Sequence, residues 1–392
     1  MAEMEFGFLN SMQNWHEKLD DFEMWEGEIA LALAADRHGF DSLWCVEHHF
    51  DAYGMCPDNI QYLSYLAPLT KTAKLVPGAV ILPWHDPLRV AEKMAMLEYF
   101  APGRTALGIG RGLARREYLG FRQDMNESRE RYAESARMVL DALNNGFIEG
   151  NGKFYQQPRV EIRPKPLRGY SDALYCVAMS DDSALAAAEL GGRMMTFIQW
   201  PIERHLPMIE LYRKSFAELH PHREVPEPVL TDVTICHEDP EEARRLAYEY
   251  LGKHYVSVVK HYEFAGDHFK DIKGYEGYQA AADLIKSAGM EESQKNYVEA
   301  QNWGTPAQII EKYRERLDLI GPFFALLEFS YGGMPFEYAQ NSLRLFAEKV
   351  MPEVRKMFSN RGKVMMQPAT FVAQGSTAAI DHRQHFFLAG SL

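Results

Sequence analysis

The stretch Asp41-Ser42-Leu43-Trp44-Cys45-Val46-Glu47-His48-His49-Phe50 decides how this chain is interpreted. Residues 41–47 form a short apolar run rich in branched and aromatic side chains, which is typical of a buried β-strand. Three ionisable residues, Glu47, His48 and His49, come just where the run stops. This arrangement favours an α/β barrel, because the carboxyl ends of barrel strands open onto the active site.

Further runs of the same kind alternate along the chain with longer stretches whose apolar positions recur at helical spacing. This alternation indicates parallel strands joined by crossover helices. The predicted fold class is α/β, a (β/α)8 TIM barrel with insertions. The predicted strands are residues 4–10, 41–47, 75–83, 104–110, 173–179, 194–200, 228–236 and 322–330, and the predicted helices lie near 24–38, 59–71, 87–100, 128–146, 181–191, 202–219, 240–262, 305–319 and 336–353.

One large domain is predicted over residues 1–357, because barrels of ~250 residues and more fold as one unit with insertions. Two stretches interrupt the alternation. Residues 147–170 indicate a small β excursion, whereas residues 263–304 are long, polar and punctuated by glycines. Long excursions on a barrel are usually lids or site walls, so residues 263–304 are the predicted lid. Residues 358–392 show no sustained period and are expected to form a C-terminal tail.

The charge balance narrows the range of partners. The 392 residues include 42 Lys and Arg against 55 Asp and Glu, a formal net charge of -13. A surplus of negative charge disfavours nucleic acid and anionic membrane surfaces as partners. The N-terminal residues lack the pattern of a signal peptide, and no apolar run approaches ~18 residues, so a cytoplasmic location is expected. The cysteines are expected to be free thiols, since none forms a CxxC pair: Cys45, Cys56, Cys176 and Cys236.

His48 is the candidate catalytic residue. Alternation along a strand places Glu47 and His49 on one face and His48 on the other, so the three are not expected to converge on a metal. The chain also lacks an HExxH motif, and no metal site is predicted. A histidine titrates near neutral pH and can act as a general base toward a substrate. A purely structural hydrogen-bonding role for His48 is the alternative.

A second group of residues points to a bound phosphate. The strand at 104–110 ends in Gly110 and is followed by Arg111, and a later helix opens near Arg129. Glycines let a backbone approach a ligand closely, and guanidinium groups grip phosphate through two hydrogen bonds. The glycine spacing does not match the dinucleotide fingerprint GxGxxG. A solvated, arginine-rich loop is the alternative interpretation.

The strand at 173–179 passes into a helix through Ser180 and Ser183. Free N–H groups at a helix start, together with two hydroxyls, make a seat that suits a phosphate. The same residues would serve equally as ordinary N-caps, and both interpretations stay open here. Gly78, inside the strand at 75–83, marks either a close backbone approach to a ligand or a kink in the barrel wall.

These segments together resemble one known family. Residues 44–54 (WCVEHHFDAYG), 75–98 (LVPGAVILPWHDPLRVAEKMAMLE), 108–121 (GIGRGLARREYLGF), 124–129 (DMNESR) and 177–183 (VAMSDDS) are similar to the bacterial luciferase family, above all to its alpha subunit. The resemblance runs from about residue 4 to residue 356. It implies a barrel that binds reduced FMN (FMNH2) delivered by a separate NAD(P)H:flavin reductase. It also implies a C4a-peroxyflavin formed with molecular oxygen, which oxidises a small organic substrate. The expected enzyme is an FMN-dependent two-component monooxygenase.

The resemblance also implies which residues hold the flavin. His48 matches the family's catalytic histidine, and Glu47 matches its neighbour on the flavin side. Gly78-Ala79 matches the position of a non-prolyl cis peptide beneath the flavin ring, and Arg111, Arg129, Ser180 and Ser183 match the phosphate-binding positions, with the Met179 backbone beside them. The full set of cofactor-binding residues that it implies is Glu47, Gly78, Ala79, Gly110, Arg111, Leu113, Arg129, Val177, Met179, Ser180 and Ser183.

Two positions depart from luciferase. Gly110 stands where luciferase has a reactive cysteine, and Met179 stands where it has a glutamate. Gly110 would open space beside the flavin edge, so a different or bulkier substrate is expected and light emission is not. Two other functions stay open, a deazaflavin (F420)-dependent oxidoreductase on the same barrel and a non-catalytic flavin-binding partner subunit. The resemblance also implies a homodimer formed through the helices near 59–71 and 87–100.

Overall fold

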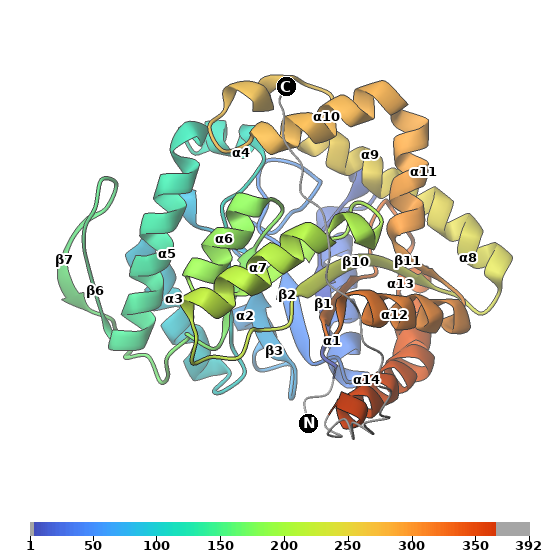
Figure 1. The fold of residues 1–392 in the computed structure, drawn as a ribbon, viewed down its shortest axis with the longest axis horizontal. Helices are drawn as coiled ribbons and strands as arrows, with labels where there is room; N and C mark the ends of the chain where they lie inside the picture. Colours follow the sequence, from blue (N-terminus) through green and yellow to red (C-terminus); the bar gives the residue numbers. More distant parts are fainter. Residues whose placement is uncertain (1–3, 366–392) are drawn as a thin grey trace, which may run out of the picture.

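The computed structural model describes residues 4–365, and their backbone forms a barrel of parallel strands surrounded by helices (Figure 1). Hydrogen bonds join the strands in the order β3-β2-β1-β12-β10-β9-β8-β5-β4. Since β3 and β4 are the two halves of one strand interrupted at Gly78-Ala79, this path closes on itself as a (β/α)8 barrel and confirms the predicted fold class. The strands are β1 Phe6–Asn10, β2 Ser42–Cys45, β3 Lys74–Pro77, β4 Val80–Ile81, β5 Leu107–Gly110, β8 Leu174–Val177, β9 Arg193–Phe197, β10 Val229–Cys236 and β12 Phe324–Glu328.

Each predicted helix is present on the outside of the barrel, although several begin or end a few residues away from the predicted limits. Local start signals explain the clearest cases. Thr305 and Gln308 form a capping box at the start of α12, and the Asp86 carboxylate accepts hydrogen bonds from the first turn of α3. The helices are α1 Asp21–Arg37, α2 Asn59–Leu66, α3 Pro87–Phe100, α5 Ser128–Asn145, α6 Asp181–Glu189, α7 Leu206–Leu219, α8 Pro240–Leu246, α9 Gly252–His261, α12 Pro306–Ile320, α13 Phe336–Leu345 and α14 Met351–Met365. Single wider turns of π type, Ala247–Leu251 and Phe346–Val350, join α8 to α9 and α13 to α14.

The lower half of the barrel interior is filled with side chains. Trp44 lies at its centre and meets Tyr175 edge to face at 4.7 Å, with Phe324 on another side at 5.9 Å. The indole N–H of Trp44 donates to the Ser42 hydroxyl, so its polar atom has a buried partner. Because this aromatic layer closes the barrel from below, a ligand can enter only from the carboxyl ends of the strands.

The two predicted insertions are present. Residues 147–170 contain a hairpin of β6 Phe147–Asn151 and β7 Gln156–Glu161, which confirms the predicted β excursion. Residues 263–304 lie over the carboxyl ends of the strands, as predicted for a lid, but they are largely helical: α10 Glu276–Ala288 and α11 Met290–Ala300, followed by β11 Asn302–Gly304. These helices were not predicted, because glycines at 274 and 289 and many polar residues hide the apolar positions that pack against the rest of the protein, such as Ile285 and Tyr297.

The remaining differences concern a short helix and the tail. α4, Arg115–Gly120, occupies a stretch that was expected to be a loop, and its N-cap Ala114 offers no side-chain cap that would signal a start. α14 continues to Met365, so the tail predicted from residue 358 begins as helix, and residues 366–392 lie outside the described part of the chain. The four cysteines are buried free thiols, as predicted. Within residues 4–365 no helix combines the length and apolar character needed to cross a bilayer.

Candidate active site

A cavity opens at the carboxyl ends of the barrel strands, where the sequence places the candidate residues. Residues at or just after the ends of the strands form its walls, and residues from α9, α10 and α11 cover it. Of the twelve predicted site residues, Arg129 and Ser180 do not line the cavity. The other ten do: Glu47, His48, Gly78, Ala79, Gly110, Arg111, Leu113, Val177, Met179 and Ser183.

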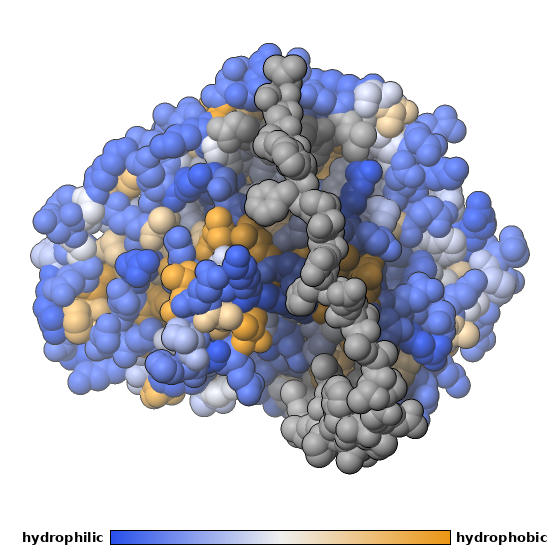
Figure 2. Space-filling model, in the orientation of Figure 1, coloured by the Kyte–Doolittle hydropathy of each residue, from blue (hydrophilic) through white to orange (hydrophobic). Residues whose placement is uncertain are grey.

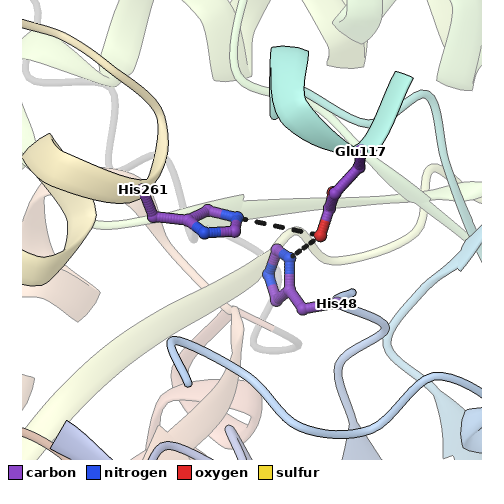
Figure 3. A group of neighbouring side chains, drawn as sticks. All are labelled: His48, Glu117 and His261. Atoms are coloured by element: carbon purple, nitrogen blue, oxygen red, sulfur yellow. Dashed lines mark hydrogen bonds and ion pairs between the residues drawn. The ribbon is translucent and has the colours of Figure 1, made fainter. Parts of the chain in front are cut away.

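His48 follows β2 and is held by a carboxylate from α4 (Figure 3). Its Nδ1 lies 3.0 Å from Oε1 of Glu117, and the same oxygen accepts a hydrogen bond of 2.8 Å from the backbone N–H of His49. Burial raises the pKa of the Glu117 carboxyl, but the His48 imidazole beside it outweighs this effect, and the pKa lies below its usual range. A charged carboxylate at Nδ1 favours the tautomer with its proton on that atom. Nε2 of His48 is then left as the acceptor, 3.4 Å from the Tyr262 hydroxyl.

His261 extends this group from the end of α9 (Figure 3). Its Nδ1 lies 3.2 Å from Oδ2 of Asp51, and its ring stands nearly perpendicular to that of His48 at 4.8 Å. The hydrogen bond with His261 lowers the pKa of Asp51 to about 2, and Asp51 also pairs with Arg116. Each of the two histidines thus contacts a carboxylate, His48 that of Glu117 and His261 that of Asp51.

The same cluster has the composition of a three-ligand metal site. One ligand atom from each of His48, Glu117 and His261 lies within 4.8 Å of the others. Oε1 of Glu117 already accepts hydrogen bonds from His48 and from the His49 amide, and His261 has its own partner in Asp51. We therefore interpret the cluster as a chain of hydrogen bonds that orients His48.

Glu47 shares a face with His49, as strand alternation predicts, and it is fully engaged with protein partners. Its carboxylate accepts hydrogen bonds from Trp84 Nε1 at 2.7 Å and from the Ile81 amide at 3.2 Å, and it meets the Nε2 atoms of His85 at 2.7 Å and of His49 at 3.2 Å. Burial alone would raise the pKa of Glu47, but these hydrogen bonds outweigh it and hold the pKa at about 2. Glu47 is thus a charged residue that fixes the shape of the cavity wall.

The floor of the cavity is formed by the break between β3 and β4. The Gly78-Ala79 peptide bond is cis, as the resemblance implies. The Asn59 amide donates to the carbonyls of Cys45 and Ala79, both at 3.0 Å, and ties this backbone to β2. A Cβ atom on Gly78 would come within 2.9 Å of the Trp44 ring, so a side chain does not fit there. The floor therefore presents bare backbone to whatever binds above it.

Arg111 and Arg129 converge at one end of the cavity beneath the lid. Nη2 of Arg111 donates to the Gly274 carbonyl at 2.9 Å, and its guanidinium group lies 4.0 Å over the Tyr275 ring. A Cβ atom on Gly274 would meet Arg129 Nη2 at 2.8 Å and Arg111 Nη1 at 3.1 Å, so both arginines flank this glycine. Arg129 also pairs with Asp182 at the start of α6, at 2.5 Å. Arg111, Arg129 and Asp182, which are far apart in the sequence, thus lie close together beneath the lid.

Ser180 and Ser183 form the N-cap of α6. The amides of Met179 and Ser180 both donate to the Ser183 hydroxyl at 2.9 Å, and the two serine side chains complete a capping box. The N-cap interpretation is therefore confirmed. Their phosphate role stays a prediction, and in this arrangement the Met179 amide is occupied by Ser183.

The comparisons with known proteins agree with this geometry. Residues 4–321 match the family model described as luciferase-like monooxygenase. The chain belongs to the luciferase-like monooxygenase family. The alkanal monooxygenase alpha chain of Photorhabdus luminescens is 25% identical over 370 residues, which cover 90% of this chain and 98% of the relative. The oxygenase component of flavin-dependent trigonelline monooxygenase from Acinetobacter baylyi is 25% identical over 364 residues, which cover 89% of this chain and 95% of the relative.

Solved structures show the same fold at lower identity. The oxygenating constituent of 3,6-diketocamphane monooxygenase from Pseudomonas putida, a type II Baeyer–Villiger monooxygenase in complex with FMN, has a TM-score of 0.69 at 18% identity over 89% of this chain and 98% of its own. An F420-dependent secondary alcohol dehydrogenase has a TM-score of 0.65 at 16% identity over 90% and 99%. With the family established, this chain is an oxidoreductase of the flavin-dependent monooxygenase class, as predicted.

The two departures from luciferase now have a structural setting in this luciferase-like enzyme. Gly110 lines the cavity, but a Cβ atom there would lie 3.0 Å from Cδ1 of Ile81 and 3.5 Å from Cβ of Ala79. Ile81 therefore occupies part of the space that Gly110 was expected to open. The sulfur of Met179 accepts from the Phe197 amide at 3.3 Å, so this side chain ties β9 to the end of β8.

Several residues of the site in this family member were not predicted. Glu117 lines the cavity and lies within residues 108–121, which carry the family resemblance, but it was not singled out there. His261 contacts this group from the end of α9, a segment in which no motif was found. Glu328 ends β12 and lines the cavity together with His254 of α9. The rule that singled out Glu47 and His48, a polar group at the end of an apolar strand, applies equally to Glu328 and would have found it.

Proposed function

We propose that this luciferase-like enzyme is the oxygenase component of a two-component system, which binds reduced FMN and uses molecular oxygen to oxidise a small organic substrate. One observation carries the proposal. A single cavity brings together a bare-backbone floor at Gly78-Ala79, the guanidinium group of Arg111 at one end and the histidine–carboxylate pair of His48 and Glu117 at the side.

The residues present fit a flavin mononucleotide. A flat ring needs a surface without side chains, and a Cβ atom on Gly78 or Gly110 would come within about 3 Å of its neighbours. A phosphate needs donors, which Arg111, Arg129 and the hydroxyls at the start of α6 would supply. To bind it, Arg111 would exchange its contact with the Gly274 carbonyl for a phosphate oxygen.

The bound flavin would supply the activation of molecular oxygen, and the protein would supply position, proton control and exclusion of water. His48 is the residue for proton control. With Nδ1 directed to Glu117, its Nε2 atom can accept or return a proton at the group that reacts. Glu117 is a positioning residue, since it acts through the orientation and charge of His48.

The lid would protect the reaction from water. Tyr275 donates to the Gly112 carbonyl at 2.7 Å, and Arg115 pairs with Glu263, so two points of the lid are tied to the loop that carries Arg111. Closing this segment over the cofactor would strengthen each charged interaction beneath it. The lid is therefore tied to the same segment of the chain that would hold the phosphate of the flavin.

The relatives support FMN more strongly than a deazaflavin. The trigonelline monooxygenase is named as flavin-dependent at 25% identity, whereas the F420-dependent dehydrogenase shares the fold at 16% identity. The trigonelline monooxygenase is described as an oxygenase component, which supports a separate flavin reductase as the partner of this chain. We also propose a homodimer and a cytoplasmic location for the enzyme. His48 and the arginines argue against the role of a non-catalytic partner subunit.

The test combines binding with turnover. Reduced FMN, reduced F420 and reduced riboflavin are titrated anaerobically into the protein, and we expect FMN to bind at least tenfold more tightly than either alternative. The FMN-loaded protein is then mixed with ¹⁸O2 and a panel of aldehydes, ketones, aromatics and heterocycles, and products are examined for incorporated ¹⁸O. Tighter binding of F420 would favour hydride transfer. FMN binding without any oxygen consumption above that of free flavin would favour the non-catalytic subunit.

A further inference from the structure

A second part of the cavity contains buried polar atoms that have no protein partner. Oε1 of Glu328, Nδ1 of His254 and Oγ1 of Thr231 are each buried without a hydrogen bond, and all three residues line the cavity. Their residues are 4%, 6% and 2% exposed. A buried polar atom without a hydrogen-bond partner destabilises the protein, because its lost contact with water is not replaced. Three such atoms in one cavity indicate a ligand that supplies the missing partners.

Strand register places two of these groups on one wall. Glu328 of β12 pairs in register with Val233 of β10, and Val233 also lines the cavity. Thr231 lies two residues before Val233, so its side chain points to the same face of the sheet. Glu328 and Thr231 therefore belong to one continuous wall made by two adjacent strands.

Aromatic rings surround this wall. The ring of His254 stacks on Tyr297 at 6.2 Å and on Tyr53 at 6.5 Å, and it meets Tyr331 edge to face at 5.5 Å. Tyr53 and Tyr297 both line the cavity. Burial raises the pKa values of all three tyrosines, and the nearby carboxylate of Glu328 adds to this effect.

Within residues 4–365, no Lys or Arg side chain pairs with Glu328. Among the cavity-lining residues that the structure describes, Arg111 is the one Lys or Arg side chain, and it is engaged with Gly274 and Tyr275 beneath the lid. The other two carboxylates of the cavity, Glu47 and Glu117, have hydrogen-bond partners. Burial raises the pKa of Glu328 to about 8, and the nearby Ser11 hydroxyl only partly opposes this effect.

We propose that this wall recognises the substrate, and that the substrate carries a cationic nitrogen, as an ammonium group or an N-alkylated aromatic ring. The positive charge lies against the carboxylate of Glu328, and the apolar body lies against the rings of Tyr53 and Tyr297. Cations bind well between a carboxylate and aromatic faces when the site is shielded from water. An anionic substrate is disfavoured, because three carboxylates line the cavity. The inference rests on the proposed function only in calling this ligand the substrate.

The test uses matched pairs of small probes and no flavin. Choline and benzyltrimethylammonium are cations, and 3,3-dimethylbutan-1-ol and neopentylbenzene are their neutral isosteres, in which carbon replaces the nitrogen. Each is titrated into the full chain by calorimetry. We expect at least one cation to bind about tenfold more tightly than its neutral match. Equal binding within both pairs, or no binding of either cation, would overturn the proposal.

Variants attribute the effect to Glu328. Glu328→Gln should reduce the preference for the cation to less than about threefold, whereas Glu328→Asp, which keeps the charge, should retain most of it. Glu98→Gln is the matched control, because Glu98 is a buried carboxylate of α3 that does not line the cavity. A preference that survives Glu328→Gln would assign the cation to another residue and contradict the inference. Because no flavin is present, the outcome is independent of whether FMN or F420 is the cofactor.

Discussion

Nδ1 of His48 lies 3.0 Å from Oε1 of Glu117, although the two residues are 69 positions apart in the sequence. The carboxylate is buried and also accepts the His49 amide, so its position is fixed by two contacts from the β2 end. A carboxylate in this position sets the tautomer of the histidine that it contacts, as the proposed catalytic role of His48 requires.

Removing either partner should lower turnover, but to different extents. We expect His48→Ala to reduce kcat by about 10²- to 10⁴-fold, the usual contribution of general acid–base catalysis. Glu117→Gln keeps the shape but removes the charge, so kcat should fall about tenfold to a hundredfold with KM nearly unchanged. Steady-state kinetics with an accepted substrate checks both. Glu218→Gln, at an exposed position of α7, is the control and should leave kcat unchanged.

The two arginines beneath the lid should bind the phosphate of the cofactor. Arg111→Met and Arg129→Met are each expected to weaken FMN binding about tenfold or more, because each removes a charge-assisted hydrogen bond. Binding of riboflavin, which has no phosphate, should change little. Fluorescence quenching titrations measure both affinities. Arg131→Met, two residues further along α5 and paired with Glu127, is the control. An equal loss for FMN and riboflavin would point to damage of the ring site.

Gly274 is the point at which the lid meets both arginines, and it should not tolerate a side chain. Its φ of +82° is one that residues with a Cβ rarely adopt, and the added atom would meet Arg129 and Arg111 at 2.8 and 3.1 Å. Gly274→Ala should therefore displace the lid and weaken FMN binding severalfold. Gly277→Ala is the control, since a Cβ atom there has open space around it. The same affinity in both variants would show that lid closure does not depend on residue 274.

The barrel was predictable because its signals are local. Each strand is an apolar run, and the helices that were predicted carry apolar positions at helical spacing, often with a cap such as Thr305. α10 and α11 were missed because their sequence is polar and their apolar side chains contact a surface that exists only once the barrel has formed. Burial of Ile285 and Tyr297 on that surface then outweighs a weak local preference for helix.

The site was predictable only in part, for a related reason. His48 stands at a strand end, and Arg111 follows one, so strand position alone indicates both. The contacts of Glu117 and His261 with His48 depend on which helices pack over β2, and strand position does not indicate that packing. The predicted phosphate role of Ser180 and Ser183 shows the limit most clearly, because these residues were open to two interpretations and the structure pairs them as a capping box. Hydrogen bonds to a ligand cannot be inferred from a pattern that also satisfies the helix itself.

The outer face of α2 and α3 should pair with a second copy of the chain. Several large apolar side chains are exposed on this outer face. By comparison, polar side chains cover most of the face of the molecule that is seen in Figure 2. Exposed apolar clusters of this kind mark association surfaces. We expect a dimer of about 90 kDa in sedimentation equilibrium, twice the 44.9 kDa of one chain. The exposed residues are Tyr65, Leu69, Met96, Tyr99 and Phe100.

Charges at that face should separate the dimer. The double variant with Met96→Glu and Phe100→Glu is expected to sediment as a folded monomer. In a dimer, the two new carboxylates of each subunit would be buried in the interface without a partner. Leu219→Glu, at the end of α7 on another helix, is the control for adding charge at an equally exposed apolar residue and should remain dimeric. A wild-type monomer at micromolar concentration would contradict the proposed homodimer.

Glu28 should make the stability of the enzyme fall as the pH rises. Its carboxyl group is fully buried, and burial raises its pKa to about 7 from an ordinary value of 4.5, despite a hydrogen bond from Asn10. Since the folded-state pKa is the higher one, its stabilising contribution is complete below about pH 4.5. That contribution is lost progressively up to about pH 7, by about 3 kcal/mol in the free energy of unfolding. Glu28→Gln cannot ionise and should escape this loss.

Urea unfolding of wild type and Glu28→Gln between pH 5 and pH 8 measures the difference. The free energy of unfolding of the variant, relative to wild type, should increase by about 2 to 3 kcal/mol across this range. Glu328, whose pKa burial raises to about 8, is also influenced by the charge of Glu28, so the same pair is compared in a Glu328→Gln background. Glu291→Gln, at an exposed position of α11, is the control and should follow wild type at each pH. Parallel curves for wild type and Glu28→Gln would mean that Glu28 ionises in the folded protein as easily as in the unfolded chain.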